Sequence, residues 1–166
     1  MRGQGAVMIL FCLGALAAPA SGNYALAEPD SVVKARVDAA ITALLSPYPT
    51  AVRSLAAPRL AARATWCGSY TLTSSASEFL VSCDGDPPVP GVYGAPGSPW
   101  TSKKGDVVKL TTTAVGDAVE IRFEGDSGYQ LVRYAPAESG LSITKTLHSN
   151  QLGLDFSWSM LYQRAP

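Results

Sequence analysis

The spacing between hydrophobic residues changes along this chain, from three or four positions before Trp66 to two positions after it. Between residues 30 and 46 the longer spacing places a set of apolar side chains on one face of a helix, namely Val33, Val37, Ala40, Ile41 and Leu44. Asp30 or Ser31 could cap the start of this helix. Pro47 follows its last turn and stops it. The sequence therefore predicts one amphipathic helix near the N-terminus.

Residues 50–65 ("TAVRSLAAPRLAARAT") are rich in alanine and are interrupted by Pro58. Because proline removes a helical hydrogen bond, we expect a connector that holds a helical turn or two. Arg53, Arg59 and Arg63 lie on it without a neighbouring acid. They indicate either a solvated connector or a basic strip that meets an acidic partner.

After Trp66 the alternation is typical of antiparallel strands with one buried face. The clearest runs are 118–124 ("AVEIRFE"), 141–148 ("LSITKTLH") and 154–163 ("LDFSWSMLYQ"). Glycine-containing turns separate the strands, whose starts lie near residues 106, 118, 129, 141 and 154. Such short connections join neighbouring strands in a meander. Together with two strands around the cysteines, this predicts a mainly β fold. We expect an antiparallel meander barrel or curled sheet of about seven to eight strands with one N-terminal helix.

Residues 84–105 ("DGDPPVPGVYGAPGSPWTSKKG") break this rhythm. Five prolines and five glycines lie in this stretch, and proline cannot donate to a strand ladder. We expect a long loop with a short edge strand near Val92 and Tyr93. Loops of this length in a compact domain are commonly functional or mobile.

The first 27 residues have the layout of a secretory signal peptide. Arg2 precedes an uncharged apolar run and a set of small residues, and the run is shorter than a bilayer requires. Small-x-small cleavage sites end at Ala20 and Ala27, and the polar segment after Ala27 favours the second; an uncut signal anchor is the alternative. The protein is thus predicted to be secreted or periplasmic. Its parts are a leader (1–27), a helix and connector (28–65) and a β-barrel domain (66–166).

Cys67 and Cys83 are the cysteines outside this leader, since Cys12 lies in the apolar run as a small hydrophobic residue. A turn centred on Ser75 would bring the pair face to face across a hairpin, and exported chains keep disulfides. A redox pair usually has two residues between its thiols, and a structural zinc site needs four ligands. We therefore predict a Cys67–Cys83 disulfide, with no metal and no cofactor.

The remaining polar motifs favour turns over catalysis. His148 is the single histidine and lies on the polar face of its strand, and the G-x-S-x-G motif of serine hydrolases is absent. "DGD" at 84–86 resembles a calcium loop and "GDSG" at 125–128 a serine-protease box, but both fit turns better. Acidic and basic residues balance, with 13 of each, which disfavours nucleic-acid binding. We expect a protein that is not an enzyme.

Aromatic residues are the candidates for ligand binding. Those on predicted strands fill the core or line an apolar cavity, whereas those in the 84–105 loop plug the barrel mouth or contact a partner. The candidate ligand-binding residues are Trp66, Tyr70, Tyr93, Trp100, Phe156 and Trp158.

The motif "WCGSYTL" at 66–72 and the ending "YQR" at 162–164 resemble the compact lipocalin-like, calycin-type barrels of exported bacterial proteins. Those barrels begin with a Trp-x-Gly-x-aromatic strand and end in an aromatic-x-Arg strand. The resemblance covers about residues 66–164. It implies a β-barrel that binds a ligand, without implying one known activity.

The expected function is that of an exported, non-catalytic binding protein for a small apolar ligand. The alternative is a protein–protein interaction module of the cell envelope or host interface, acting through the 84–105 loop. A hydrolase-type enzyme is the third reading. Neither a nucleic-acid partner nor stable membrane insertion after removal of the leader is expected.

Overall fold

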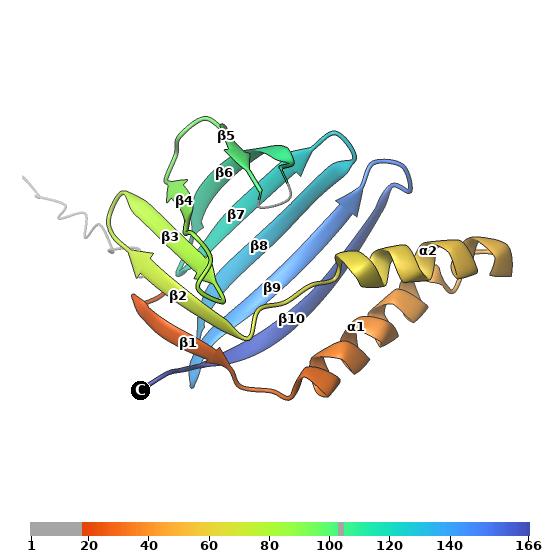
Figure 1. Ribbon diagram of the computed structural model, residues 1–166, viewed down its shortest axis with the longest axis horizontal. Helices are drawn as coiled ribbons and strands as arrows, with labels where there is room; N and C mark the ends of the chain where they lie inside the picture. Colours follow the sequence, from red (N-terminus) through yellow and green to blue (C-terminus); the bar gives the residue numbers. More distant parts are fainter. Residues whose placement is uncertain (1–17, 103–104) are drawn as a thin grey trace, which may run out of the picture.

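A single antiparallel sheet dominates the fold (Figure 1). The computed structural model describes residues 18–102 and 105–166, and within them the sheet has ten strands and is accompanied by two helices. The strands are β1 (Gly22–Leu26), β2 (Ser69–Ser74), β3 (Glu78–Cys83), β4 (Val89–Val92), β5 (Ser98–Thr101), β6 (Val107–Val115), β7 (Ala118–Gly125), β8 (Gly128–Ala137), β9 (Gly140–Ser149) and β10 (Leu154–Arg164). The helices are α1 (Asp30–Leu45) and α2 (Thr50–Arg63).

The predicted mainly β class and the β6–β10 meander are confirmed, but the strand count exceeds seven to eight. β4 and β5 form within the proline-rich 84–105 segment, where each is a four-residue strand. β1 comes from residues that were assigned to the leader. The prediction of one helix is also wrong, because the 50–65 segment forms α2 with Pro58 inside it. The high helix propensity of its alanines is sufficient to continue the helix past this proline.

The strands follow the order β4-β3-β2-β1-β10-β9-β8-β7-β6-β5. Consecutive strands are therefore sheet neighbours, except that β4 and β5 lie at opposite edges and β1 pairs with β10. The sheet curls until its two halves face each other. The ring of Tyr70 in β2 lies edge-on to that of Tyr134 in β8, with 6.0 Å between the centroids. Phe79 in β3 approaches Tyr134 to 5.3 Å. The concave face therefore forms a partly enclosed interior.

The curl brings the β4 end of the sheet against β6. Tyr93, directly after β4, forms a parallel bridge with Thr112 of β6. A Cβ atom on Gly91 of β4 would lie 2.6 Å from both the Phe79 carbonyl oxygen and Thr112 Oγ1. Glycine is therefore needed at position 91 for this close approach.

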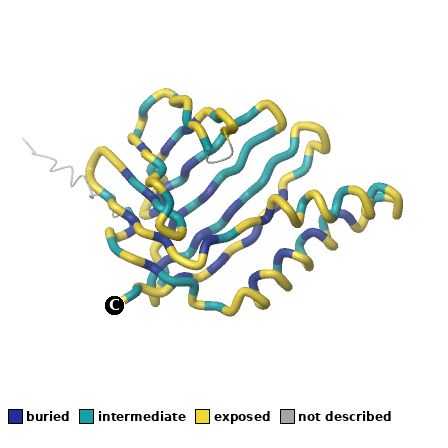
Figure 2. The backbone as a smooth tube through the Cα atoms, in the orientation of Figure 1, coloured by how far each residue is buried: buried dark blue, intermediate teal, exposed yellow. Residues whose placement is uncertain are grey.

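Buried residues alternate with more exposed ones along the strands (Figure 2). The contacts of Tyr134 with Tyr70 and Phe79 across the curl place the buried residues on the concave face. This face is apolar and largely inaccessible, and its residues that are 0% exposed include Phe79, Val119, Ile121, Leu141, Ile143 and Met160. The alternation predicted from the sequence for β7, β9 and β10 is the cause of this separation.

α1 runs beside β10 and α2 lies next to it (Figure 1). α1 buries Val33, Val37, Ile41 and Leu45. The predicted apolar face is confirmed at its first two positions and at Ile41, while Ala40 and Leu44 are half-buried against the core. The predicted cap is not the observed one, since Pro29 occupies the N-cap position. The Asp30 carboxylate instead accepts a hydrogen bond of 2.8 Å from Trp66 Nε1.

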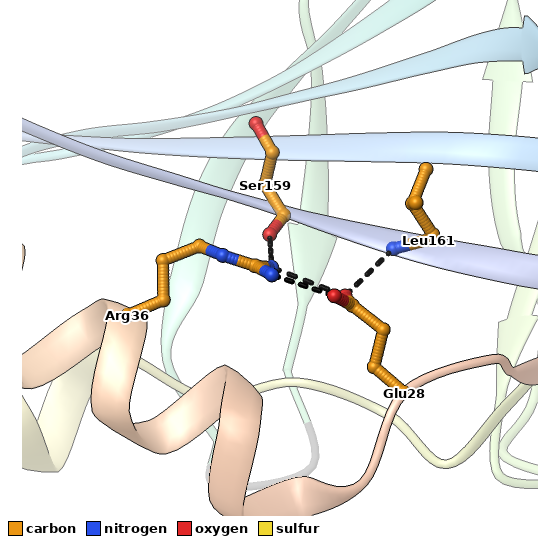
Figure 3. Close-up of polar contacts among 4 residues, drawn as sticks. All are labelled: Glu28, Arg36, Ser159 and Leu161. Atoms are coloured by element: carbon orange, nitrogen blue, oxygen red, sulfur yellow. Dashed lines mark hydrogen bonds and ion pairs between the residues drawn. The ribbon is translucent and has the colours of Figure 1, made fainter.

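A polar clamp holds α1 against β10 (Figure 3). Arg36 donates to both carboxylate oxygens of Glu28, over 2.6 and 3.1 Å, and to the Ser159 carbonyl oxygen. The backbone amide of Leu161 donates to Glu28. The bond from Arg36 lowers the pKa of Glu28. Both members of the clamp, Arg36 and Glu28, thus form a hydrogen bond with the backbone of β10.

The Cys67–Cys83 disulfide is present, with 5.7 Å between the two Cα atoms, but the register that predicted it is wrong. In the ladder between β2 and β3, Cys83 pairs with Tyr70 and Ser74 pairs with Phe79. Cys67 lies two residues before β2 begins. The bond therefore ties the segment entering the sheet to the end of β3.

The predicted leader and the sheet overlap in the chain. Residues 1–17 lie outside the described residues, whereas β1 pairs with both β10 and β2. Cleavage after Ala27 would remove β1, and cleavage after Ala20 would retain it. Among the described residues, no helix is long and apolar enough to cross a membrane.

Candidate functional site

The concave face of the sheet encloses a pocket of about 430 Å³, called the inner pocket below. Its walls come from both halves of the curled sheet and from the segment between α2 and β2. The apolar part of the lining includes Tyr70, Val81, Trp100, Phe123, Val132 and Tyr134. A pocket of this size and lining suits one small apolar molecule.

Lys145 is the polar feature of the inner pocket. Among residues 18–102 and 105–166 it is the one charged side chain that is buried, at 6% exposure. It lies in β9 at a position where alternation places apolar side chains, and it pairs with Val132 of β8 and Trp158 of β10. Its Nζ donates to the Thr65 carbonyl oxygen over 2.9 Å. Burial lowers the pKa of Lys145 to about 8, and attraction to Asp84 opposes this shift.

Three tyrosines surround the same end of the interior. Tyr70 packs edge-on against Tyr162 as well as Tyr134, at 5.1 Å from the former. Tyr162 donates to the Cys67 carbonyl oxygen over 2.7 Å. Burial raises the pKa of each phenol, so all three remain neutral near pH 7. They supply hydroxyl groups to the interior without adding charge.

The segment 64–68 closes this end of the pocket. Its carbonyl groups accept from Lys145 and Tyr162, and the disulfide fixes it at Cys67. Asp84, which adopts a left-handed conformation with φ 49°, accepts from the Gly68 and Ser69 amides at 3.3 and 2.8 Å. The "DGD" stretch is thus a turn that supports this segment.

A second hollow, called the outer groove below, has a volume of about 710 Å³ and lies between the helices and the far ends of β6–β10. Leu44 and Leu60 contribute from the helices, and Leu147 and Phe156 contribute from the sheet. The inner pocket and the outer groove share Thr65, Phe123 and Gln130 in their linings. The two hollows therefore adjoin.

The structure brings four of the six candidate aromatic residues to these hollows. Trp66, Tyr70 and Trp100 line the inner pocket, and Phe156 lines the outer groove. Trp100 also packs edge-on against Phe123, with 5.6 Å between centroids. The loop aromatic Trp100 therefore folds back onto the barrel mouth, which was one of the two alternatives for it.

Tyr93 and Trp158 belong to neither lining. Tyr93 is half-buried at the bridge to Thr112 and packs against the core. Trp158 is 3% exposed and stacks on Phe156 at 5.0 Å. Its indole nitrogen is buried and has no hydrogen-bond partner within the described part of the chain. Both residues contribute to packing beside the pocket.

His148 forms a cross-strand pair with Asp155, with 2.9 Å between Nδ1 and Oδ1. It also stacks on Tyr129 at 4.8 Å. Neither contact supplies a nucleophile, and the carboxylate of Asp155 is largely exposed at 62%. This pair offers no support for the hydrolase reading.

Cys67, Cys83 and Asp84 lie close enough together to resemble a metal site. Both sulfur atoms are consumed by the disulfide, so neither is a thiolate ligand. The cluster is better explained as the support of the 64–68 segment.

The most informative residue of the site, Lys145, was not among the candidates. A usable signal was present in the sequence, because Lys145 falls in the apolar phase of "LSITKTLH", between Ile143 and Leu147. A lone charge in that phase points into the interior of a curled sheet. Gln130 and Val132 carried no comparable signal, because "YQLVRYA" lacks a clear alternation.

Fold and site together define a class of protein: a strongly curled antiparallel sheet with an apolar-walled interior pocket and a helical hairpin between its first two strands. Two solved structures of similar fold illustrate it. One is described as "REP1-NXSQ fatty acid transporter", is 14% identical and gives a TM-score of 0.51, with 88% of this chain and 96% of that chain covered. The other, secretory abundant heat soluble protein 4 from Ramazzottius varieornatus, is 14% identical and gives a TM-score of 0.50, with 92% and 97% covered.

These identities show a shared fold and nothing further about function. No model of a known protein family matches the sequence, and no curated protein matches it either. The resemblance to lipocalin-like barrels is thus supported at the level of a curled antiparallel β-sheet fold. Membership of the lipocalin-like group itself stays a prediction.

Proposed function

We propose that this protein is a non-catalytic binding protein that holds a small apolar ligand in the inner pocket. The observation that carries the proposal is the half-open hollow of about 430 Å³ between the two halves of the sheet. A solidly packed interior would have contradicted it. The adjoining outer groove extends the available space beside the helices.

The name of one neighbour, a fatty acid transporter, agrees with this chemistry. The aromatic and aliphatic walls of the inner pocket would bury the hydrocarbon part of such a ligand. Of the predicted aromatic residues, we propose Trp66, Tyr70 and Trp100 as wall residues of the inner pocket and Phe156 as a wall residue of the outer groove.

The alternative reading, a protein–protein module acting through the 84–105 loop, requires an apolar patch around Tyr93 and Trp100. Both side chains are only partly exposed and pack against the protein's own core. Their packing favours the ligand-binding function over this alternative.

Substitution at the junction of the two hollows tests the proposal. Gln130 is half-buried and lines both, so Gln130→Trp should fill the shared space. With a fluorescent fatty-acid analogue as the probe, we expect affinity to fall by about tenfold or more. Gln163→Trp places the same side chain at an exposed position of β10 and should leave affinity unchanged. If the wild type does not bind the probe, or if both variants bind like the wild type, the proposal is wrong.

We also propose that the protein is exported and that cleavage follows Ala20, because this site retains β1. Intact-mass measurement of protein purified from its own host under native conditions tests both points. We expect an N-terminus at Ser21, a mass two hydrogens below that of the dithiol, and a co-purified apolar molecule. A chain starting at Glu28 would overturn the cleavage proposal, and an uncut chain with free thiols would overturn export.

A further inference from the structure

We infer that the ligand of the inner pocket carries one carboxylate head group, whose oxygens accept hydrogen bonds from the Lys145 ammonium group. This inference rests on the proposed function and names the chemical class of its ligand. Lys145 lines the inner pocket together with Tyr70 and Tyr134. It therefore meets any molecule that occupies the hollow.

The Lys145 ammonium group has more donors than the protein uses. An ammonium group carries three N–H donors. One of them donates to the Thr65 carbonyl oxygen. In the described part of the chain Nζ forms no other hydrogen bond, so two donors remain for a ligand.

The nearby ionisable groups do not neutralise this charge. The Asp84 carboxylate is held by the Gly68 and Ser69 amides and by Ser69 Oγ, and it acts on Lys145 only through longer-range attraction. Burial raises the pKa values of the tyrosines at this end of the interior, so their hydroxyls stay neutral. The described residues thus leave one buried positive charge without a contacting counter-ion.

A carboxylate would compensate this charge. Burying an ammonium group without a counter-ion is unfavourable, and charge-assisted hydrogen bonds are stronger than neutral ones. An alcohol or an ester of the same chain length would fill the pocket but would leave the Lys145 ammonium group without a counter-ion. One cation also matches a carboxylate better than a phosphate monoester, which carries nearly two negative charges near pH 7.

The pairing of β8 with β9 also indicates a path for the hydrocarbon chain of the ligand. Lys145 pairs with Val132, and the next inward pair along β8 and β9 is Gln130 with Leu147. Gln130 lines both hollows, and Leu147 lines the outer groove. A ligand with its head at Lys145 can therefore extend along β8 and β9 from the inner pocket toward the outer groove.

Calorimetric titration with dodecanoate and with 1-dodecanol, which share one chain length, tests the inference. We expect the wild type to bind dodecanoate about tenfold or more tightly than 1-dodecanol. Lys145→Met should remove this preference by weakening dodecanoate binding and sparing 1-dodecanol. Lys145→Arg keeps the charge and should keep the preference. Lys109→Met, at an exposed position of β6, is the control and should behave like the wild type.

The outcomes separate the inference from the proposed function. If the wild type binds both compounds equally, or if Lys145→Met keeps the preference for dodecanoate, the inference is wrong while apolar ligand binding stands. If the wild type binds neither compound, the proposed function fails as well. Circular dichroism of each variant confirms that it is folded, and Lys145→Gln, which also removes the charge, takes the place of Lys145→Met if Lys145→Met does not fold.

Discussion

At the scale of single residues, Lys145 is the position where stability and function conflict most clearly. Its neighbours along the inward face of β9, Ile143 and Leu147, are apolar, and a methionine would fill its place without desolvating a charge. The lysine instead destabilises the empty protein, because its charged form is disfavoured by burial. Functional sites commonly keep such locally unfavourable residues.

The burial of the Lys145 ammonium group predicts an unusual dependence of stability on pH. The pKa of Lys145 is about 8 in the folded protein, against an ordinary pKa of 10.5 for a lysine exposed to solvent. Between these two values the unfolded chain binds more protons than the folded one, so the free energy of unfolding rises with pH. For the ligand-free protein we expect a gain of about 2 kcal/mol between about pH 7.5 and about pH 9.5, measured by urea unfolding.

Lys145→Met should abolish this gain and should be more stable than the wild type at the lower pH. Tyr70, Tyr134 and Tyr162, whose pKa values are raised by burial, act in the opposite direction, but only once tyrosines of the unfolded chain ionise near pH 10. A wild type whose stability is flat or falls over the stated window would show that Lys145 is not desolvated.

At the scale of elements, the disulfide organises the closed end of the pocket. It fixes the 64–68 segment, and that segment provides the carbonyl groups that accept from Lys145 and Tyr162. Replacing both cysteines by serine should lower the free energy of unfolding by about 3 kcal/mol. It should also weaken binding of the fluorescent fatty-acid analogue, because Thr65 would no longer be held beside Lys145.

Chemical reduction of the wild type gives an independent measurement of how much the disulfide contributes to stability. Its unfolding midpoint in urea should fall to that of the double serine variant. If reduction changes stability but leaves probe affinity intact, the 64–68 segment is held by its hydrogen bonds alone and the disulfide has no part in shaping the pocket.

Whether an element could be predicted from the sequence depends on whether local pattern or a distant partner causes it to form. α1, β7, β9 and β10 follow from local periodicity, because one face of each contacts the core, and β6 and β8 follow from the regular spacing of the turns. β4 corresponds to the edge strand predicted near Val92 and Tyr93, whereas β5 depends on its partner β6 and its proline argued against pairing. β1 was hidden because Gly22–Leu26 resembles the end of a leader. The predicted disulfide is present although the predicted turn centre is wrong. The expected export of the chain and its two remaining cysteines predicted the disulfide independently of the strand register.

The site was predictable only in part for a similar reason. Trp66, Tyr70, Trp100 and Phe156 are large aromatic residues, and such residues line most apolar pockets. Lys145 becomes informative only when the sheet is known to curl, because an inward lysine on a flat sheet would be solvated. That the two halves of the sheet meet is a property of the whole molecule.

At the scale of the whole molecule, the partly enclosed interior depends on contacts between distant strands, which are the packing of Tyr70 and Phe79 on Tyr134 and the contact of β4 with β6. The sheet order ends at β4 on one side and at β5 on the other. The Tyr93–Thr112 bridge and the approach of Gly91 to Thr112 join β4 to β6. Loss of this contact would open the interior without breaking any hairpin, so the closure and the hairpins should respond separately to mutation.

Gly91→Ala tests this separation, because the added Cβ would lie 2.6 Å from the Phe79 carbonyl oxygen and from Thr112 Oγ1. β4 must then move away, at a cost of about 1–3 kcal/mol. Gly125→Ala in β7 is the matched control, since its Cβ meets Val108 Cγ1 at an ordinary 3.7 Å, and stability there should be unchanged or slightly raised. In hydrogen exchange measured by mass spectrometry, Gly91→Ala should deprotect residues 89–93 and 107–115 and spare 140–149. Equal deprotection of all three segments would mean that closure and hairpins form one cooperative unit, and that the interior cannot open while the meander stays folded.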